Sequence, residues 1–376
     1  METLLNVPEG QFELQRLPQR KHEKLRAWDA ADEYLLQYLS ENCNLSSATR
    51  ILIVNDSFGA LAVALHRFNP VAISDSYLSR QATLLNFAAN DLPEDCIQLR
   101  NSLDWPEQQL DLVLIKVPKT LALLEQQLIQ LQPLLTAETK IIAAGMVKAM
   151  PASVWKLMER YLGPTKPSLA KKKARLIFIS LNTQIAWSAN PYPVYYQLEN
   201  TGFRICNHAN VFSRESLDIG TRFLLQHLPK NTHAKDIVDL GCGNGIVGLM
   251  LADYYRESHL YFVDESYMAV ASAKETFRLA FEHRQADFCV TDGLTEFETE
   301  SMDLIVCNPP FHQQNTVGNQ IALSMFKQSQ RVLRKGGKLW VIGNRHLAYH
   351  IDLKKIFKEY NEIASNAKFV IWQVIK

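Results

Sequence analysis

The segment Asn308-Pro309-Pro310-Phe311 combines residue types that could prepare an amino group for alkylation. An amino nitrogen conjugated to an aromatic ring is a poor nucleophile, because its lone pair is delocalised into the ring. The Asn308 side-chain oxygen and the Pro309 carbonyl could each accept one of its N–H bonds and aim the lone pair. The prolines would hold both acceptors in advance, and the Phe311 ring offers a face on which a planar base can stack. The segment therefore predicts transfer of an alkyl group to an amino nitrogen on a planar ring, and this transfer requires no strong base.

A glycine-rich turn earlier in the same half predicts a nucleoside-containing ligand. In Asp239-Leu-Gly241-Cys-Gly243-Asn-Gly245, the glycines let the backbone approach a ligand at φ values that other residues avoid. Asp264 ends the next expected strand, where a carboxylate can accept hydrogen bonds from both hydroxyls of a ribose. Asp292 lies in the following turn, placed to reach an adenine edge. The same glycines also fit a dinucleotide site, which is a weak signal by itself, and Asn308 argues against that alternative.

The elements that would position these residues occur twice along the chain. Each half has a β-branched strand, a turn, a helix start and two further strands; the strands span 50–54, 71–74 and 111–115 in the first half and 236–240, 259–263 and 303–307 in the second. This alignment pairs three strand-end residues across the halves: Asn55 with Asp239, Asp75 with Asp264, and Lys116 with Asn308. We therefore expect an α/β fold of two tandem Rossmann-like domains, each a mostly parallel twisted sheet with helices on both faces.

The length of 376 residues and a composition that is 47% hydrophobic agree with two globular domains. We place the domains at 1–185 and 199–376, with 186–198 as a linker that contains two prolines. The six cysteines include no CxxC pair, and no spacing of cysteine and histidine predicts a metal site. The first residues resemble no signal peptide, and no apolar run is long enough to span a bilayer. We therefore expect a cytoplasmic monomer that needs no metal, no membrane and no obligate protein partner.

The chain as a whole resembles a known group of enzymes. The glycine-rich turn Asp239–Gly245 followed by Asn308-Pro-Pro-Phe311 resembles the class I S-adenosylmethionine-dependent N-methyltransferases. The segment 207–221 and the duplicated first half are similar to the bacterial ribosomal RNA guanine-N2 methyltransferases, which form a small-subunit (16S) and a large-subunit (23S) family. The chain length and the segments 27–34 and 115–125 favour the large-subunit family. The resemblance covers essentially the whole chain.

This resemblance implies an enzyme that transfers a methyl group from S-adenosylmethionine to the exocyclic N2 of a guanine in 23S ribosomal RNA. In duplex RNA this N2 lies in the minor groove and is paired, so the target base must be unpaired or flipped out. The implied catalytic residues are Asn308, Pro309, Pro310 and Phe311. The implied cofactor residues lie in expected turns or at expected strand ends: Asp218, Gly220, Asp239, Gly241, Gly243, Gly245, Asp264 and Asp292. Of these, the turn glycines would hold the methionine part, with Asp218 and Gly220 at its amino-acid end.

The first half keeps the strands but lacks the residues that carry this chemistry. Ser57, Gly59 and Leu61 stand where the second half has its turn glycines, and Lys116-Val-Pro-Lys119 replaces the segment 308–311. Side chains would fill the space that a cofactor needs. We therefore expect the first half to be catalytically inactive.

A local excess of positive charge predicts another task for the inactive half. The formal net charge of the whole chain is +1, which taken alone argues against a nucleic-acid partner. However, residues 140–175 contain nine Lys or Arg and one acid, which gives +8 and leaves −7 for the other 340 residues. We expect the first half to bind ribosomal RNA phosphates through basic residues near this stretch: Lys116, Lys119, Lys148, Lys171, Lys172, Lys173 and Arg175.

Other functions remain open on the sequence alone. One is guanine-N2 methylation of small-subunit 16S RNA. Two others are glutamine-N5 methylation of a protein, in which tyrosine typically stands at the position of Phe311, and adenine-N6 methylation of DNA; the duplicated basic half disfavours both. The last is an RNA-binding assembly factor that no longer methylates, and the joint presence of the turn glycines, Asp264 and Asn308 disfavours it.

Overall fold

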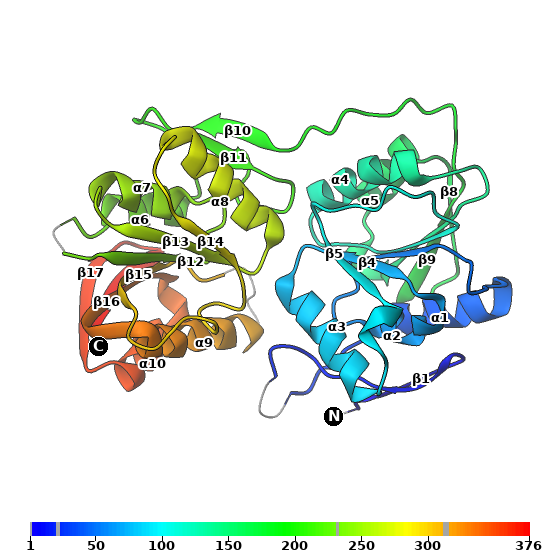
Figure 1. Cartoon of the computed structure of the whole chain (residues 1–376), viewed down its shortest axis with the longest axis horizontal. Coiled ribbons are helices and arrows are strands. Elements are labelled where there is room, and N and C mark those ends of the chain that lie inside the picture. Colours follow the sequence, from blue (N-terminus) through cyan, green and yellow to red (C-terminus); the bar gives the residue numbers. More distant parts are fainter. Residues whose placement is uncertain (1, 20–22, 231–232, 311–315) are drawn as a thin grey trace. The chain divides into compact units, whose positions relative to one another are not determined.

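The computed structural model describes residues 2–19, 23–230, 233–310 and 316–376. The chain divides into two compact units, Met1–Tyr192 and Pro193–Lys376, which we call the first and the second domain (Figure 1). We describe each domain by itself.

The first domain is a seven-stranded sheet covered by helices on both faces. Its elements are β1 (Leu4–Val7), β2 (Gly10–Glu13), α1 (Ala30–Asn42), β3 (Ile51–Val54), α2 (Ala60–Ala64), β4 (Val71–Ser74), α3 (Tyr77–Ala89), β5 (Gln98–Asn101), β6 (Leu112–Lys116), α4 (Leu121–Leu131), β7 (Lys140–Met146), α5 (Ala152–Tyr161), β8 (Thr165–Pro167) and β9 (Ala174–Ile179). The sheet order is β5-β4-β3-β6-β7-β9-β8, and neighbouring strands are parallel except where β9 pairs with β7 and β8. Helices α1 and α2 pack on one face of the sheet, and α4 and α5 pack on the other (Figure 1).

The second domain repeats this arrangement. Its elements are β10 (Val194–Gln197), β11 (Arg204–Asn207), α6 (Ile219–Gln226), β12 (Asp236–Leu240), α7 (Ile246–Tyr254), β13 (His259–Asp264), α8 (Tyr267–Ala280), β14 (Asp287–Val290), β15 (Met302–Cys307), α9 (Thr316–Val332), β16 (Leu333–Asn344), α10 (Tyr349–Ile356), β17 (Glu359–Ser365) and β18 (Phe369–Ile375). The sheet order is β14-β13-β12-β15-β16-β18-β17, and only the pairs made by β18 are antiparallel. Helices α6 to α8 cover one face, and α9 and α10 cover the other.

The central strands show why these sequences form sheets with two covered faces. Strand β3 reads Ile-Leu-Ile-Val and is buried at every position, and β6 is buried up to its last residue. Continuous β-branched and aliphatic runs of this kind are typical of parallel strands with helices on both sides. The predicted fold class, two tandem Rossmann-like domains, is confirmed.

The duplication includes a small hairpin that the sequence analysis missed. In the first domain, the hairpin β1–β2 contacts α3, where the Asn90 side-chain oxygen accepts the Glu13 N–H at 2.8 Å. In the second domain, the hairpin β10–β11 contacts α8, where the Thr276 hydroxyl accepts the Cys206 N–H at 3.0 Å. The repeated unit is therefore a hairpin followed by a complete seven-stranded sheet.

The described parts of the chain contain no helix that is long and apolar enough to cross a membrane. Within the same residues, no cluster of three or more His, Cys, Asp or Glu side chains is placed to hold a metal ion.

Candidate active site

The glycine turn between β12 and α7 exposes backbone at the carboxyl end of the second sheet. Gly241, Gly243 and Gly245 have φ values of +76°, +53° and +79°, a left-handed region that side chains make costly. A Cβ on Gly243 would meet no atom within 4 Å, whereas a Cβ on Gly245 would lie 2.8 Å from the Ala273 Cα. Gly245 therefore lets α8 pack closely, and Gly243 borders the open space that a ligand would use.

Two acids lie near this open space. Asp264 ends β13, and its carboxylate accepts the N–H bonds of Gly243 and Ser266, each at 3.0 Å. Because a carboxylate has about four acceptor positions, Asp264 can accept ribose hydroxyls beside these bonds. Asp292 follows β14, and its carboxylate makes no hydrogen bond or ion pair with a described residue, while burial raises its pKa. A half-buried acceptor in this state fits a donor such as the adenine amino group.

Asp239 lies beneath the turn and not beside the open space. Its side chain is buried, and its Oδ2 accepts the Gly248 N–H in the first turns of α7 at 2.7 Å. Burial raises the pKa of Asp239 to about 8, only partly offset by this single bond, and the charge of Asp264 adds to the rise. Asp239 therefore supports the turn, which differs from the direct cofactor contact that the sequence predicts.

Asn308 follows β15 directly and lies at the same carboxyl edge. Its backbone oxygen is 3.7 Å from the position that a Cβ on Gly241 would take. Its Nδ2 donates a hydrogen bond to Thr221 Oγ1 at 3.1 Å, and its Oδ1 is buried and accepts no hydrogen bond from the described residues. Because an unpaired buried acceptor costs about 1–3 kcal/mol, this oxygen is well suited to receive an N–H bond from a ligand.

The remaining residues of the predicted site have mixed placements. Asp218 is the N-cap of α6, and Gly220 is buried so tightly that a Cβ would lie 3.1 Å from the Phe369 ring. Pro309 is buried and Pro310 is exposed. The predicted stacking residue, Phe311, lies outside the described residues.

Thr221 is a site residue that the sequence analysis missed. Its hydroxyl joins Asn308 to Asp218, since Oγ1 accepts from Asn308 Nδ2 and lies 3.4 Å from Asp218 Oδ2. The available signal was its position three residues after a helix N-cap, where a polar side chain faces the start of the helix.

Two buried thiols near the site contribute no nucleophile. Burial raises the pKa of Cys242 well above its usual value, and the charges of Asp264 and Asp239 raise it further. Burial has the same effect on the pKa of Cys307, again with a contribution from Asp239. Both thiols therefore stay protonated, which agrees with their interpretation as packing residues.

Strand pairing in the two sheets corrects the alignment of the halves. Val54 pairs with Ile73 and Ile115, and Leu240 pairs with Val263 and Cys307. The strand-end residues that follow therefore correspond as Asn55 with Gly241, Ser74 with Asp264, and Lys116 with Asn308. The predicted pairing of Lys116 with Asn308 is confirmed, and the pairings of Asn55 with Asp239 and of Asp75 with Asp264 are wrong.

The glycine positions shift in the same way. Gly59 and Gly245 are both helix N-caps with φ of +79°, so Gly59 corresponds to Gly245, and the predicted match with Leu61 is wrong. The sequence-based alignment of the two turns is shifted because each half buries one acid under its turn, but at a different position in the chain. In the first domain this acid is Asp56, in the turn itself, and in the second it is Asp239, in the strand.

At the corresponding positions, the first domain has other side chains in place of a glycine and carboxylates. The Asn55 side chain donates to the Lys116 carbonyl at 3.0 Å and to Gln127 Oε1 at 2.9 Å, at the position where the second domain has Gly241. Ser74 offers a hydroxyl where the second domain has Asp264. Asn101 pairs with Ser74, and Val290 pairs with Asp264, so Asn101 and Val290 correspond. Two residues further along the chain, Leu103 therefore corresponds to Asp292.

Lys116 is engaged inside the first domain. Its Nζ donates to Asp29 Oδ1 at 3.0 Å and to Asp32 Oδ1 at 2.5 Å, and its side chain is 15% exposed. Burial opposes the charge of Lys116, but the neighbouring charges of Asp32 and Asp29 raise its pKa overall. The structure therefore removes Lys116 from the predicted RNA surface, because its ammonium neutralises two acids of the domain.

The tip of the hairpin β8–β9 carries the densest group of lysines. Lys172 and Lys173 have φ values of +48° and +63° and form a two-residue turn, closed by backbone bonds between Lys171 and Ala174. Lys171 Nζ lies 4.8 Å from the centre of the Tyr34 ring, and Lys172 forms an exposed 2.9 Å ion pair with Glu33. The Lys172 side chain is 77% exposed, and an ion pair of such a lysine contributes about 0–1 kcal/mol.

Two more exposed lysines lie at the same edge of the first sheet. The Lys173 carbonyl accepts the Val147 N–H at 2.9 Å, which brings the hairpin tip beside Lys148. Lys119 follows the carboxyl end of β6, the neighbour of β7. We call the five residues Lys119, Lys148, Lys171, Lys172 and Lys173 the basic edge. Arg175 differs from them because it is half-buried and its Nε is buried without a partner in the described chain.

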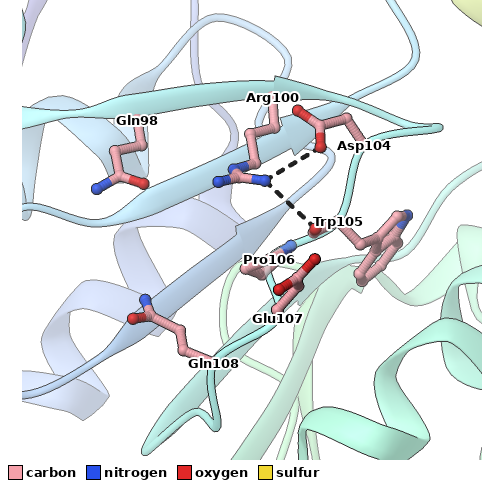
Figure 2. A pocket seen from close by; sticks show the side chains of 7 residues that line it. All are labelled: Gln98, Arg100, Asp104, Trp105, Pro106, Glu107 and Gln108. Carbon is pink, nitrogen blue, oxygen red and sulfur yellow. Dashed lines mark hydrogen bonds and ion pairs between the residues drawn. The ribbon is translucent and has the colours of Figure 1, made fainter.

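A pocket of about 370 Å³ on the first domain is lined by none of these lysines. Its walls are strand β5 and the loop after it, with Gln98, Arg100, Asp104, Trp105, Pro106, Glu107 and Gln108 (Figure 2). The Arg100 guanidinium donates to Asp104 Oδ1 at 3.1 Å and to the Trp105 carbonyl at 3.3 Å. Its charge is thus used within the pocket, which also contains a second acid, Glu107, and is poorly suited to a phosphate.

Known proteins match both domains. The family model described as the RLMG N-terminal domain matches residues 2–183, and the methyltransferase small domain matches residues 202–373. The structure is similar to that of a T. thermophilus 16S rRNA N2 methyltransferase in complex with AdoMet and guanosine, with a TM-score of 0.79, 19% identity, and coverage of 100% of this chain and 97% of that chain. At this identity the likeness shows the fold alone.

Full-length relatives are more closely related. The chain is 48% identical to Ribosomal RNA large subunit methyltransferase G of Aeromonas salmonicida, with 100% of both chains covered. It is 46% identical to the protein of the same name from Streptomyces griseus, with 98% of both chains covered. The chain therefore belongs to the ribosomal RNA large subunit methyltransferase G family.

Proposed function

We propose that the chain transfers a methyl group from S-adenosylmethionine to the exocyclic N2 of a guanine in 23S ribosomal RNA, in the cytoplasm. Membership of the family supports the large-subunit RNA as substrate over the small-subunit RNA. The observation that carries the chemistry is Asn308 Oδ1, which is buried, accepts no hydrogen bond from the described residues and lies at the same edge as the open space beside Gly243.

The residues at this edge fit the parts of S-adenosylmethionine, whose sulfonium supplies an electrophilic methyl group. Asp264 would accept the ribose hydroxyls, and Asp292, with no partner in the described chain, would accept the adenine amino group. The open space at Gly243, with Gly241 in the same turn, would border the methionine part. The first domain has Asn55, Ser74 and Leu103 at the corresponding positions, so we propose that one cofactor binds per chain.

The acceptor side of the reaction depends on Asn308. Its Oδ1 would accept one N–H bond of the guanine amino group and draw the nitrogen lone pair out of conjugation with the ring. The Pro309 carbonyl would accept the second N–H bond. Once alkylated, the nitrogen is acidic enough to lose its proton to solvent or to a carbonyl, so positioning supplies most of the catalysis.

Labelled cofactor tests this proposal directly. The protein is incubated with methyl-labelled S-adenosylmethionine and naked 23S RNA, naked 16S RNA or assembled subunits, and the label is mapped to a nucleotide. We expect N2-methylguanosine in 23S RNA. Label in 16S RNA, on adenine, on protein or nowhere would contradict the proposal.

We also propose that the first domain binds RNA phosphates through the basic edge. Five exposed lysines lie at one end of its sheet, and the hairpin tip holds three of them in consecutive positions. Each lysine–phosphate interaction releases condensed counterions, so binding through this edge should weaken steeply with salt.

Alanine substitution measures that contribution. Replacing Lys171, Lys172 and Lys173 together should lower RNA affinity and reduce the slope of log K against log salt by about 0.7–0.9 for each lysine that binds a phosphate. The matched control replaces Lys354, Lys355 and Lys358, three exposed lysines of the second domain, and should leave the slope unchanged. Equal slopes for both triple variants and the unaltered protein would reject the basic edge as the RNA surface.

A further inference from the structure

The Asn308 side chain has two ends that differ in chemistry and hardly in shape. Its oxygen accepts hydrogen bonds and its NH2 group donates them, and a half-turn of the amide exchanges the two. An NH2 group presented to the target amino group would place donors against donors and remove the acceptor that the reaction needs. Catalysis through Asn308 therefore requires that the amide orientation be fixed before the substrate arrives.

The contacts of Thr221 determine which end faces the substrate. A hydroxyl has one hydrogen, and Asp218 Oδ2, 3.4 Å from Thr221 Oγ1, is an oxygen of an acceptor-only carboxylate. The hydroxyl hydrogen therefore goes to Asp218, and the Oγ1 lone pairs accept the Asn308 N–H at 3.1 Å. With the amide turned over, Asn308 Oδ1 would need the hydrogen that Asp218 Oδ2 now receives, and the single hydroxyl hydrogen could serve only one of the two oxygens.

The chain of three side chains is held firmly at its far end. Asp218 caps α6, where its Oδ2 also accepts the Thr221 backbone N–H at 2.9 Å. Thr221 is 7% exposed, and the intervening Gly220 packs closely against Phe369. With Nδ2 bonded to Thr221 in the first turn of this helix, Asn308 Oδ1 is left as the buried oxygen without a partner in the described chain.

The first domain shows that the fold itself brings these three positions together. Asp29 is the N-cap of α1, Asp32 is the third residue of that helix, and Lys116 contacts both carboxylates. These positions correspond to Asp218, Thr221 and Asn308. An ammonium between two carboxylates forms the same bonds in any rotation, so of these two sets of three residues only that of the second domain has a bond that a half-turn of a side chain would reverse.

We infer that Thr221 and Asp218 are positioning residues, which orient the Asn308 amide with its oxygen towards the target amino group. The identity of that amino group rests on the proposed function. The orientation of the amide is a property of the second domain alone and can be measured without substrate.

Two variants of Thr221 separate positioning from packing. Thr221→Val keeps the shape and removes the hydroxyl, and Thr221→Ser keeps the hydroxyl and removes a methyl group. We expect Thr221→Val to lower kcat by about 10- to 100-fold while KM for RNA and Kd for S-adenosylmethionine stay within about threefold. Thr221→Ser should restore kcat to within about threefold of the unaltered protein. Equal losses in both variants, an unchanged kcat in Thr221→Val, or a loss confined to cofactor affinity would overturn the inference.

Nuclear magnetic resonance of the Asn308 side chain gives a readout that needs no activity. Its NH2 signals, assigned by their disappearance in Asn308→Asp, should show one hydrogen protected from solvent exchange in the unaltered protein and in Thr221→Ser. Protection should be lost in Thr221→Val. If the protein does not methylate guanine but this pattern holds, the proposed function fails and the positioning inference stands. If protection is the same in all three proteins, the positioning inference fails whatever the substrate.

Discussion

The two domains share one sheet order and one set of strand-end positions, but they differ in what occupies those positions. Four of the differences are Gly241 against Asn55, Asp264 against Ser74, Asp292 against Leu103, and Asn308 against Lys116. In the second domain these positions provide a glycine, two carboxylates and, at Asn308, a buried acceptor with no partner among the described residues. In the first domain, Asn55 and Lys116 bond to neighbours in the same domain.

This comparison shows how one architecture can carry different sets of residues at the same edge of its sheet. Unpaired buried acceptors and left-handed glycines cost stability, and they persist where a ligand compensates for them. Once no ligand is bound, side chains that bond to one another are the more stable solution. At the carboxyl edge of the first domain, Asn55 and Lys116 form such bonds.

The largest effect that tests this comparison is expected at Lys116. Lys116→Met would leave the buried Asp32 and its neighbour Asp29 without a counter-charge, which should destabilise the first domain by about 3–5 kcal/mol. Denaturant unfolding of the whole chain, followed as separate transitions of the two domains, measures this change. The triple variant Asp29→Asn, Asp32→Leu, Lys116→Met removes the charges together and should recover most of the loss. An unchanged unfolding free energy in Lys116→Met would show that the ion pairs of Lys116 with Asp29 and Asp32 do not stabilise the first domain.

The next effect concerns the corresponding residue of the second domain. Asn308→Ala should lower kcat by about 10²- to 10³-fold, because it removes a preorganised acceptor used in the transition state. Kd for S-adenosylmethionine, measured by titration calorimetry, should change by less than about threefold. Lys116→Met is the matched control and should keep its kcat at temperatures where the first domain is folded. A fall in kcat in that control would mean that the first domain takes part in the reaction.

A smaller effect is expected at Asp264, the proposed ribose acceptor, compared with its counterpart Ser74 in the first domain. Asp264→Asn replaces a charged acceptor and should weaken binding of S-adenosylmethionine by about 10- to 100-fold. Ser74→Ala, at the corresponding position of the first domain, should leave cofactor affinity unchanged. Calorimetry should also give one binding site per chain. Two sites, or a loss of affinity in Ser74→Ala, would show that the first domain still binds the cofactor.

Much of this arrangement could be predicted from the sequence, because local patterns specify it. The buried aliphatic runs predicted the central strands, and the polar residues that end them placed Asp264 and Asn308 at one edge of the sheet. The detailed correspondence of the turns could not be predicted. Asp56 accepts the Ala62 N–H and Asp239 accepts the Gly248 N–H; these two N–H groups correspond, but the two acids do not. The role of Lys116 was equally hidden, because its partner Asp32 lies 84 residues away in the chain.

The smallest effect concerns these two buried acids and appears as a dependence on pH. Asp56 accepts the N–H bonds of Ala60, Leu61 and Ala62, and burial raises its pKa to about 6. Asp239 accepts only one such bond from the described residues, and burial raises its pKa to about 8. Fewer donors thus leave the charged form of Asp239 less favourable, as expected when hydrogen bonds offset desolvation.

The sign of the effect follows from proton binding. Between its unfolded pKa of 3.8 and its folded pKa of about 8, Asp239 holds a proton in the folded domain that the unfolded chain releases, so stability falls as pH rises through this window. Asp239→Asn does not titrate, so its stability relative to the unaltered protein should increase between pH 6 and pH 7, by at most about 1.4 kcal/mol. Any pH-independent loss of stability caused by the new amide shifts the plot of relative stability against pH without changing its slope.

For Asp56→Asn the gain in stability relative to the unaltered protein should flatten above pH 6, because Asp56 is then charged in both the folded and the unfolded state. Denaturant midpoints of the two domains across pH 5 to 8 test both slopes, and identical curves would contradict the difference in donor number as the cause.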